Sequence, residues 1–212
     1  MITRTEIASL PVAAEVDVLV VGGGPAGVAA SLSAARLGVR TMIVEQFNCL
    51  GGIATAGGHA HICLYSEWGS PRRVVGGIPF ETAQRVTSAG YGVHNNHEAD
   101  FEIEGMKKVL EEMAEQAGVT LRYYTLFAET IVEDTRVVGV VVQSKSGREV
   151  ILARRTVDCT GDGDVAASAG CKFLMGAEDS GPCQPATLMF TIGGVDYDRV
   201  RKFRGTDYKL KS

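Results

Sequence analysis

The sequence predicts an α/β fold in which a parallel sheet is extended by an antiparallel β-meander. Two apolar runs, at residues 16–21 and 39–44, flank an Ala- and Leu-rich segment at residues 25–37. This arrangement is typical of a βαβ unit of about 30 residues. A second helical segment follows at residues 101–117, and short apolar runs separated by turn residues fill most of residues 120–159. Such closely spaced short strands favour a meander.

The βαβ unit is predicted from local pattern alone. Residues 16–21 (VDVLVV) form a short, β-branched run ended by glycine, which is typical of a buried parallel strand. The helix at residues 25–37 has a natural C-terminal stop at Gly38. The second strand, at residues 39–44, follows directly. Residues 1–14 are expected to be a polar, loosely held leader.

The remaining elements follow from periodicity. Residues 49–77 are glycine-rich and aperiodic, and are expected to form loop and short helix. Apolar residues recur every three to four positions in residues 101–117, which predicts an amphipathic helix. A helix is also predicted at 79–89, strands at 120–127, 128–133, 137–145, 149–153 and 156–159, and a short helix at 165–169.

Composition narrows the function classes. The chain has 212 residues, of which 45% are hydrophobic, enough for one large domain or two small ones. A net charge of -4 argues against nucleic acid or an anionic membrane as the partner, since both attract clustered Lys and Arg. The five cysteines show no C-x-x-C spacing and are expected to be reduced. The run at 16–21 is too short to span a membrane and no signal-peptide pattern is visible, so a cytoplasmic location is expected.

The glycine cluster at residues 22–27 (GGGPAG) contains the pattern G-x-G-x-x-G. It lies between a predicted strand and a predicted helix, the context in which this pattern indicates dinucleotide binding. Gly22 permits the tight turn, Gly24 lets the backbone approach a pyrophosphate, and Gly27 allows close helix–strand contact. The helix N-terminus then directs N–H groups at the phosphates. An ADP-containing cofactor is therefore predicted; the alternative is an ordinary glycine turn.

Glu45 ends the second strand of the βαβ unit. An acidic residue at that place accepts hydrogen bonds from the ribose hydroxyls of an adenosine. Its negative charge would repel a 2′-phosphate, so NADP is disfavoured.

Two further motifs distinguish FAD from NAD. An NAD dehydrogenase would continue with further βα units, whereas this chain carries LGGIATAG at residues 50–57 and VDCTGDGD at residues 157–164. With these motifs the sequence resembles the FAD-dependent oxidoreductases of the glutathione-reductase-like superfamily. Within it, the closest resemblance is to the bacterial family that pairs GGGPAG with TGDGD.

The resemblance implies a Rossmann-like FAD-binding domain and a partial substrate, or cap, domain. Residues 1–65 and 100–170 would form the FAD-binding domain, and residues 66–99 and 171–212 the partial cap. The implied cofactor is FAD, and the implied activity is hydride transfer between a small organic substrate and FAD. An NAD-binding dehydrogenase is the rival enzyme, and thiazole-forming proteins that share the fold are a weaker analogy.

The resemblance also assigns FAD contacts to three segments. The first would hold the pyrophosphate, the adenosine ribose and the adenine, and comprises Gly22, Gly24, Pro25, Ala26, Gly27, Glu45 and Gln46. The second would run under the pyrophosphate and the ribityl chain, and comprises Gly51, Gly52 and Thr55. The third would touch the adenine through the backbone of Phe127 or Ala128 and close over the FAD with Thr160, Gly161, Asp162 and Asp164. The acids of the third segment also suit a helix cap, which does not exclude the FAD role.

The family's usual length exceeds that of this chain, which stops at Ser212 after a segment resembling a family strand at residues 184–195. The returning segment that ordinarily contacts the flavin ring would be missing. A truncated or partner-dependent FAD-binding module without activity of its own is therefore an alternative to an active enzyme. The chain could also be a fragment or one subunit of a split enzyme, and a homo-oligomer or a missing C-terminal partner stays open.

His59 and His61 are the candidate catalytic residues. Both follow the motif at residues 50–57, and a histidine can carry a proton near neutral pH beside a flavin. Ordinary loop histidines are the more common case. The two histidines could also bind a metal, but no third and fourth ligands cluster with them in the sequence.

Two other features of the segment that follows the motif at residues 50–57 stay open. Cys63 is a redox thiol or an inert, packed cysteine. Trp68, Arg72 and Arg73 lie where a substrate pocket is expected, and an arginine there could clamp a carboxylate, unless the loop is simply solvated.

Overall fold

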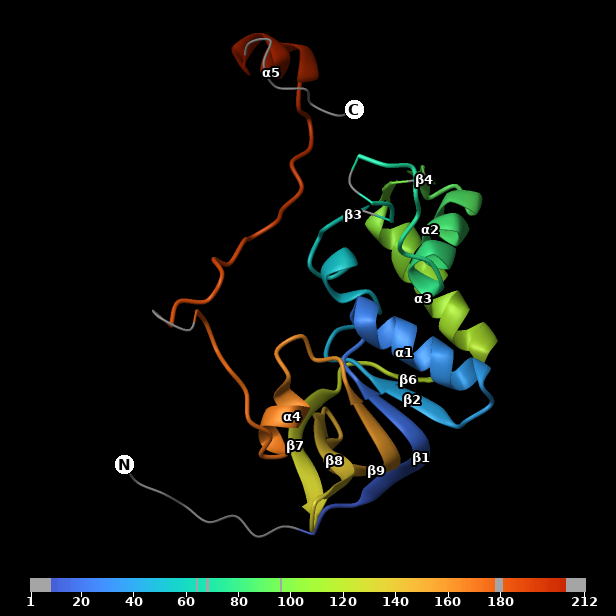
Figure 1. Cartoon of the computed structure of the whole chain (residues 1–212), viewed down its shortest axis with the longest axis vertical. Helices are drawn as coiled ribbons and strands as arrows, with labels where there is room; N and C mark the ends of the chain where they lie inside the picture. Colours follow the sequence, from blue (N-terminus) through green and yellow to red (C-terminus); the bar gives the residue numbers. More distant parts are fainter. Residues whose placement is uncertain (1–8, 64, 68, 96, 178–180, 205–212) are drawn as a thin grey trace.

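The computed structural model of the chain describes residues 9–63, 65–67, 69–95, 97–177 and 181–204 (Figure 1). The strands are β1 (Val12–Val21), β2 (Thr41–Val44), β3 (His61–Ile62), β4 (Gly92–His94), β5 (Ala99–Phe101), β6 (Thr120–Arg122), β7 (Leu126–Glu133), β8 (Arg136–Ser144) and β9 (Gly147–Asp158). The helices are α1 (Pro25–Arg36), α2 (Ile78–Ser88), α3 (Ile103–Ala117), α4 (Asp164–Ser168) and α5 (Tyr197–Arg204), with a 3-10 turn at Gly52–Ala54.

A six-stranded sheet has the order β6-β2-β1-β9-β8-β7. The pairs β6–β2, β2–β1 and β1–β9 are parallel, whereas β9–β8 and β8–β7 are antiparallel. The predicted α/β fold, with a parallel sheet extended by a meander, is confirmed. Because β9 pairs with β1 on one side and β8 on the other, it joins the two halves of the sheet.

Three predicted strand boundaries are wrong. The strands expected at 149–153 and 156–159 are one strand, β9, because β1 pairs with it across the polar Arg154 and Arg155. The break expected between residues 127 and 128 lies at 123–125, since β6 joins the parallel edge and the chain must then cross to the opposite edge to begin β7. β1 begins at Val12, inside the expected leader, because Val12 pairs with Val150. Residues 1–8 lie outside the described residues.

A second sheet, β3-β5-β4, was not predicted. Its strands have two or three residues each, too short to show a period of two. Phe101 pairs with Gly92 in this sheet, so α3 begins at Ile103 and not at residue 101.

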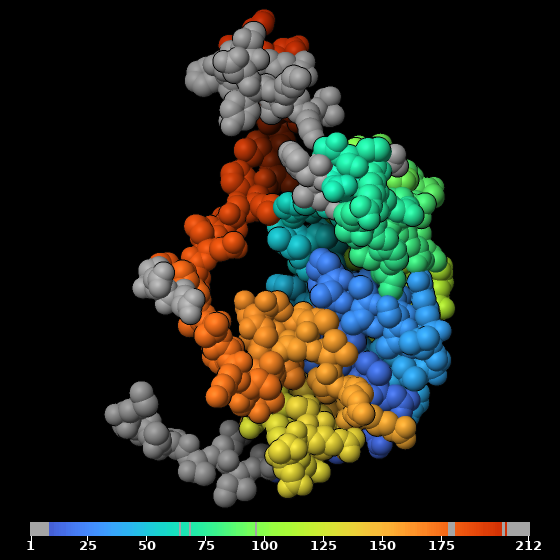
Figure 2. Space-filling view, in the orientation of Figure 1, coloured from blue at the N-terminus to red at the C-terminus, as the bar shows by residue number. Residues whose placement is uncertain are grey.

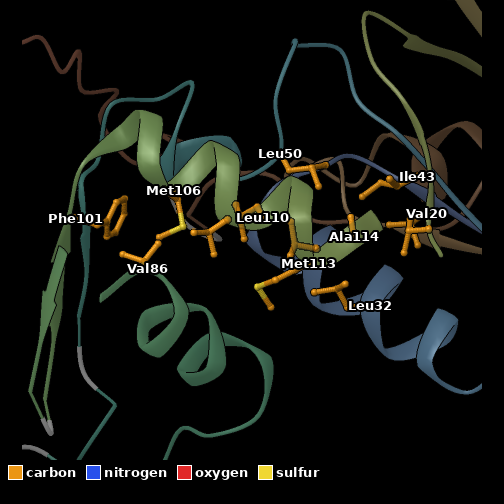
Figure 3. Packing of buried hydrophobic residues seen from close by; sticks show 13 residues of the cluster. Val20, Leu32, Ile43, Leu50, Val86, Phe101, Met106, Leu110, Met113 and Ala114 are labelled. Atoms are coloured by element: carbon orange, nitrogen blue, oxygen red, sulfur yellow. The ribbon is translucent and has the colours of Figure 1, made fainter. Parts of the chain in front are cut away.

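The larger core lies between the sheet and the helices α1 and α3, and reaches α2 through Val86 (Figure 3). The predicted apolar face of α3 supplies Met106, Val109, Leu110, Met113 and Ala114. Alternation along β1 sends Val20 to this core and Leu19 and Val21 to a second core on the opposite face of the sheet.

Beyond α4 the chain runs as an extended arm to α5 (Figures 1 and 2). Residues 184–195, expected to resemble a strand, are neither strand nor helix, because no described strand lies beside them to pair with. Large apolar side chains of the arm, including Leu174, Leu188 and Phe190, are exposed. Within the described ranges, no helix combines the length and apolar character needed to cross a bilayer.

Candidate cofactor site

The three glycine-rich segments, at residues 22–27, 50–57 and 160–164, meet at the carboxyl ends of β1, β2 and β9. The Gly51 N–H donates to the Gly23 carbonyl oxygen at 2.8 Å, and the Cys159 N–H donates to the Val21 carbonyl oxygen at 2.8 Å. A cavity of about 950 Å³ opens at this point. The predicted site residues that line it are Gly22, Gly24, Pro25, Ala26, Glu45, Gln46, Gly52, Phe127, Thr160, Gly161 and Asp164.

The glycines of the first segment differ in their surroundings. Gly22 has φ +99°, and a Cβ there would lie 2.2 Å from the Cys159 carbonyl oxygen. A Cβ on Gly27 would lie 1.8 Å from the Gly22 carbonyl oxygen. A Cβ on Gly24 would meet nothing within 4 Å. The loop is thus crowded at two glycines, at Gly22 by the residue that follows β9 and at Gly27 by the loop itself, and is left open at Gly24.

The N-terminus of α1 lies at the cavity, where Gly24, Pro25 and Ala26 line the wall. Gly24 is the N-cap and supplies no side-chain hydrogen bond, and the first turn contains no acidic residue. The first N–H groups of a helix have no partner within the helix and carry a partial positive charge. An uncapped helix end without acids, facing a cavity, fits a phosphate group.

The Glu45 carboxylate is 5% exposed and holds two loops together. Oε2 accepts a hydrogen bond from the Gly23 N–H at 2.6 Å, and Oε1 accepts one from the Phe47 N–H at 2.8 Å. Each carboxylate oxygen has a further acceptor site. Glu45 therefore fixes the glycine loop and can still accept a hydrogen bond from a ligand in the cavity.

Asp158, which the sequence analysis missed, organises the third segment. Its Oδ1 accepts hydrogen bonds from the Thr160 N–H and hydroxyl, and its Oδ2 accepts one from the Ala166 N–H at 2.9 Å. Partial burial raises the pKa of this carboxyl, but the hydrogen bonds from Ala166, Thr160 and Val165 outweigh burial and leave the pKa below its ordinary value. The usable signal was its position, an acid at the carboxyl end of a parallel strand.

Several predicted residues do not line the cavity: Gly27, Gly51, Thr55, Ala128 and Asp162. Gly27 lies beneath the loop, and Thr55 is buried with its hydroxyl donating to the Leu50 carbonyl oxygen at 2.6 Å. Ala128 is exposed where the register of β7 shifts against β8, and the neighbouring Phe127 lines the wall instead.

Two residues of the arm, Thr187 and Met189, also line the cavity. No motif marks them, because only the path of the chain brings this segment back to the glycine loops. Cys159 lines it too, and burial, together with the Asp158 charge, raises the pKa of its thiol.

His59, His61 and Cys63 line a different cavity, of about 320 Å³. Pro25 and Ile53 line both cavities and stand between them. The described residues include no group of three or more His, Cys, Asp and Glu able to hold a metal ion. Arg72 and Arg73 line neither cavity, and the Arg73 guanidinium lies 4.3 Å from the centre of the Phe80 ring. Trp68 lies outside the described residues.

The sheet order, the glycine loop and the uncapped helix define a dinucleotide-binding α/β protein, with its site at the carboxyl ends of the strands. Residues 17–211 match the family described as FAD dependent oxidoreductase, so the chain belongs to that family and FAD is its cofactor.

Two curated relatives are thiamine thiazole synthases. The protein of Methanococcus aeolicus is 28% identical over 79% of this chain and 62% of its own length. That of Aeropyrum pernix is 32% identical over 59% of this chain and 43% of its own length. The chain thus spans less than two thirds of the relatives it matches.

Solved structures share the fold. The THI4 protein of Thermovibrio ammonificans superposes with a TM-score of 0.54 at 22% identity, covering 74% of this chain and 64% of that protein. A geranylgeranyl bacteriochlorophyll reductase-like protein of Thermoplasma acidophilum gives 0.53 at 21% identity, with coverage of 74% and 42%.

Proposed function

We propose that the protein transfers a hydride between a small organic substrate and FAD bound in the larger cavity. The observation that carries the proposal is the meeting of three glycine-rich segments at one cavity, against an uncapped helix N-terminus. FAD supplies the redox chemistry when bound, and the protein positions it.

The cavity-lining residues suggest how FAD would be held. The α1 N-terminus, with Gly24 and Ala26, would receive the pyrophosphate, and Glu45 would accept hydrogen bonds from the adenosine ribose. Gln46 would lie beside the adenine, Gly52 under the pyrophosphate, and Thr160 on the facing wall.

We also propose a division into a FAD-binding part, residues 1–65 and 100–170, and a partial cap, residues 66–99 and 171–212. α2 and β4 support the cap assignment, since both lie within residues 66–99, whereas β3 and most of β5 lie outside that range. The cap would carry the substrate next to the wall formed by Pro25 and Ile53.

Release of the bound cofactor, with identification by mass and fluorescence, tests the proposal. FAD is expected from the purified protein, and Glu45→Ala or Gly24→Val should lower FAD occupancy while the far-ultraviolet circular dichroism spectrum stays the same. Leu37→Ala, at an exposed position outside both cavities, is the matched control. Unchanged FAD content in both site variants would overturn the site assignment.

Formation of a thiazole is a second candidate function, favoured by the two thiamine thiazole synthases among the relatives. The same release experiment separates the two, because a thiazole-containing compound differs from FAD in mass. A third candidate is a partner-dependent FAD-binding module. It would bind FAD normally but fail to exchange electrons with any substrate or dye.

A further inference from the structure

The smaller cavity lies among α1, α2, α3 and the segment at Gly51–Cys63, and its walls are mainly apolar. Val28, Ile53, Ile62, Met106 and Leu110 contribute aliphatic surface. An apolar cavity of about 150 Å³ is large enough to bind benzene. A cavity of about 320 Å³ therefore has room for a ring with substituents.

The contacts of the two histidines in the wall define their neutral tautomers. His59 Nδ1 lies 2.9 Å from the His61 carbonyl oxygen, and His61 Nδ1 lies 2.6 Å from Asp100 Oδ1. A carbonyl oxygen and a carboxylate only accept hydrogen bonds, so both Nδ1 atoms carry hydrogen and donate. In each neutral ring Nε2 is then the acceptor, the atom able to receive a proton or hydrogen bond.

The other polar groups of the wall are weaker candidates for binding a ligand. The Thr82 hydroxyl already donates to the Ile78 carbonyl oxygen at 2.9 Å. Cys63 is a weak hydrogen-bonding group. Around His61, Asp100 and Glu98 are the facing charged groups, with Asp100 Oδ1 2.6 Å from Nδ1 and Glu98 Oε2 3.9 Å from Nε2.

We propose that this cavity binds a small, mainly apolar organic molecule bearing one hydroxyl group, which donates a hydrogen bond to Nε2 of His61. The apolar walls hold the carbon skeleton, and the hydrogen bond that His61 Nδ1 donates to Asp100 leaves Nε2 of the neutral ring as the acceptor for the hydroxyl group. Only the assignment of this molecule as the substrate rests on the proposed function. Binding itself does not.

Equilibrium dialysis with 2-naphthol and naphthalene, two probes that differ by one hydroxyl, tests the site. The FAD-loaded protein should bind 2-naphthol, and His61→Phe should weaken that binding about five- to tenfold, the value of one hydrogen bond. Naphthalene binding should change less than about twofold, because the ring of the side chain stays. His94→Phe is the matched control, since His94 belongs to the same small sheet but does not line the cavity. Ala54→Phe, which fills the cavity, should abolish binding of both probes.

A spectroscopic measurement covers the case in which His61→Phe fails to fold. The ¹⁵N chemical shifts of the His61 ring in the wild type should report hydrogen on Nδ1 and none on Nε2 at pH 8, with a change at Nε2 when 2-naphthol is added. Asp100→Ala, at an exposed side chain, should shift the ring toward the opposite tautomer. Wild-type tautomers in that variant would overturn the proposal.

Two further outcomes would also overturn it. One is equal loss of both probes in His61→Phe. The other is competition between 2-naphthol and FAD, which would assign the cavity to the cofactor itself. Retained 2-naphthol binding in a protein that never holds FAD would refute the proposed function while leaving this site intact.

Discussion

The glycines of the cluster at residues 22–27 have different structural roles, although they belong to one motif. Gly27 is crowded by the Gly22 carbonyl, whereas Gly24 faces open space and has an ordinary φ of -66°. Gly27 is needed for the fold, because a side chain would not fit there, whereas Gly24 leaves space at the cavity wall that a ligand can occupy. Substitution at the two positions should therefore fail in different ways.

Gly27→Ala should destabilise the protein by about 1–3 kcal/mol, since the added methyl overlaps a backbone atom that must move. Gly24→Ala should cost the cofactor-free protein only about 0.5 kcal/mol through its N-cap position, yet lower FAD affinity at least tenfold. Urea unfolding of the cofactor-free protein and FAD titration measure the two effects. Equal stability of the two variants would contradict this division of roles.

The negative charge of Asp158, in the motif at residues 157–164, is expected to stabilise the folded protein. Its folded-state pKa lies below the value of about 3.9 expected in the unfolded chain, so its contribution is complete well above pH 4 and is lost as the pH falls through the folded pKa. Asp158→Asn should therefore lower the free energy of unfolding at pH 7, and the gap from wild type should narrow below about pH 4. Chemical unfolding at several pH values measures this. A gap that stays constant down to pH 2 would show that the charge plays no part.

Two elements, α3 and β9, contribute to the walls of the two cavities, β9 to the larger one and α3 to the smaller one. β9 pairs with β1 and β8, and its carboxyl end carries the third motif to the glycine loop. The buried face of α3 joins the main core and, through Met106 and Leu110, also forms part of the smaller cavity wall. Loss of α3 contacts should thus weaken the fold as a whole.

Met113→Ala tests the contribution of α3, because Met113 is 1% exposed in the core and lines neither cavity. Removal of this side chain should lower the free energy of unfolding by about 2–5 kcal/mol. Glu112→Ala, on the exposed face of the same helix, should change it by less than about 0.5 kcal/mol. Denaturant unfolding compares the two, and a similar effect of both substitutions would argue against the core role of α3.

For the whole molecule, the larger cavity depends on segments that are distant in the chain. Its lining residues come from the glycine cluster at residues 22–27, the motif at residues 50–57, β9 and the arm. A ligand that contacts all of them binds the folded chain only, so its binding energy adds to stability.

FAD at 100 times its Kd should therefore stabilise the protein by about 2.7 kcal/mol and raise Tm by about 5–10 °C. ADP at the same concentration should raise Tm less, because it lacks the flavin half. Differential scanning calorimetry measures both. An ADP effect equal to that of FAD would mean that the flavin makes no contact.

Local pattern in the sequence determined much of this protein. The period of 3.6 in α3 and the apolar runs of β1 and β2 each depend on residues close together in the chain, and each predicted the type and place of its element, though not its first residue. The order of these elements predicted the fold class, and FAD was implied by the family resemblance that the motifs at residues 50–57 and 157–164 carry.

Only the tertiary structure decided which residues share a wall. It put Thr55 and Ala128 away from the larger cavity, brought Thr187 and Met189 to it, and paired His61 with Asp100 across 39 residues. Such placements depend on strand order and long-range pairing, which a local sequence pattern does not encode. A motif can be read from residues that are adjacent in the chain, whereas a site consists of groups that come together only after the sheet has formed.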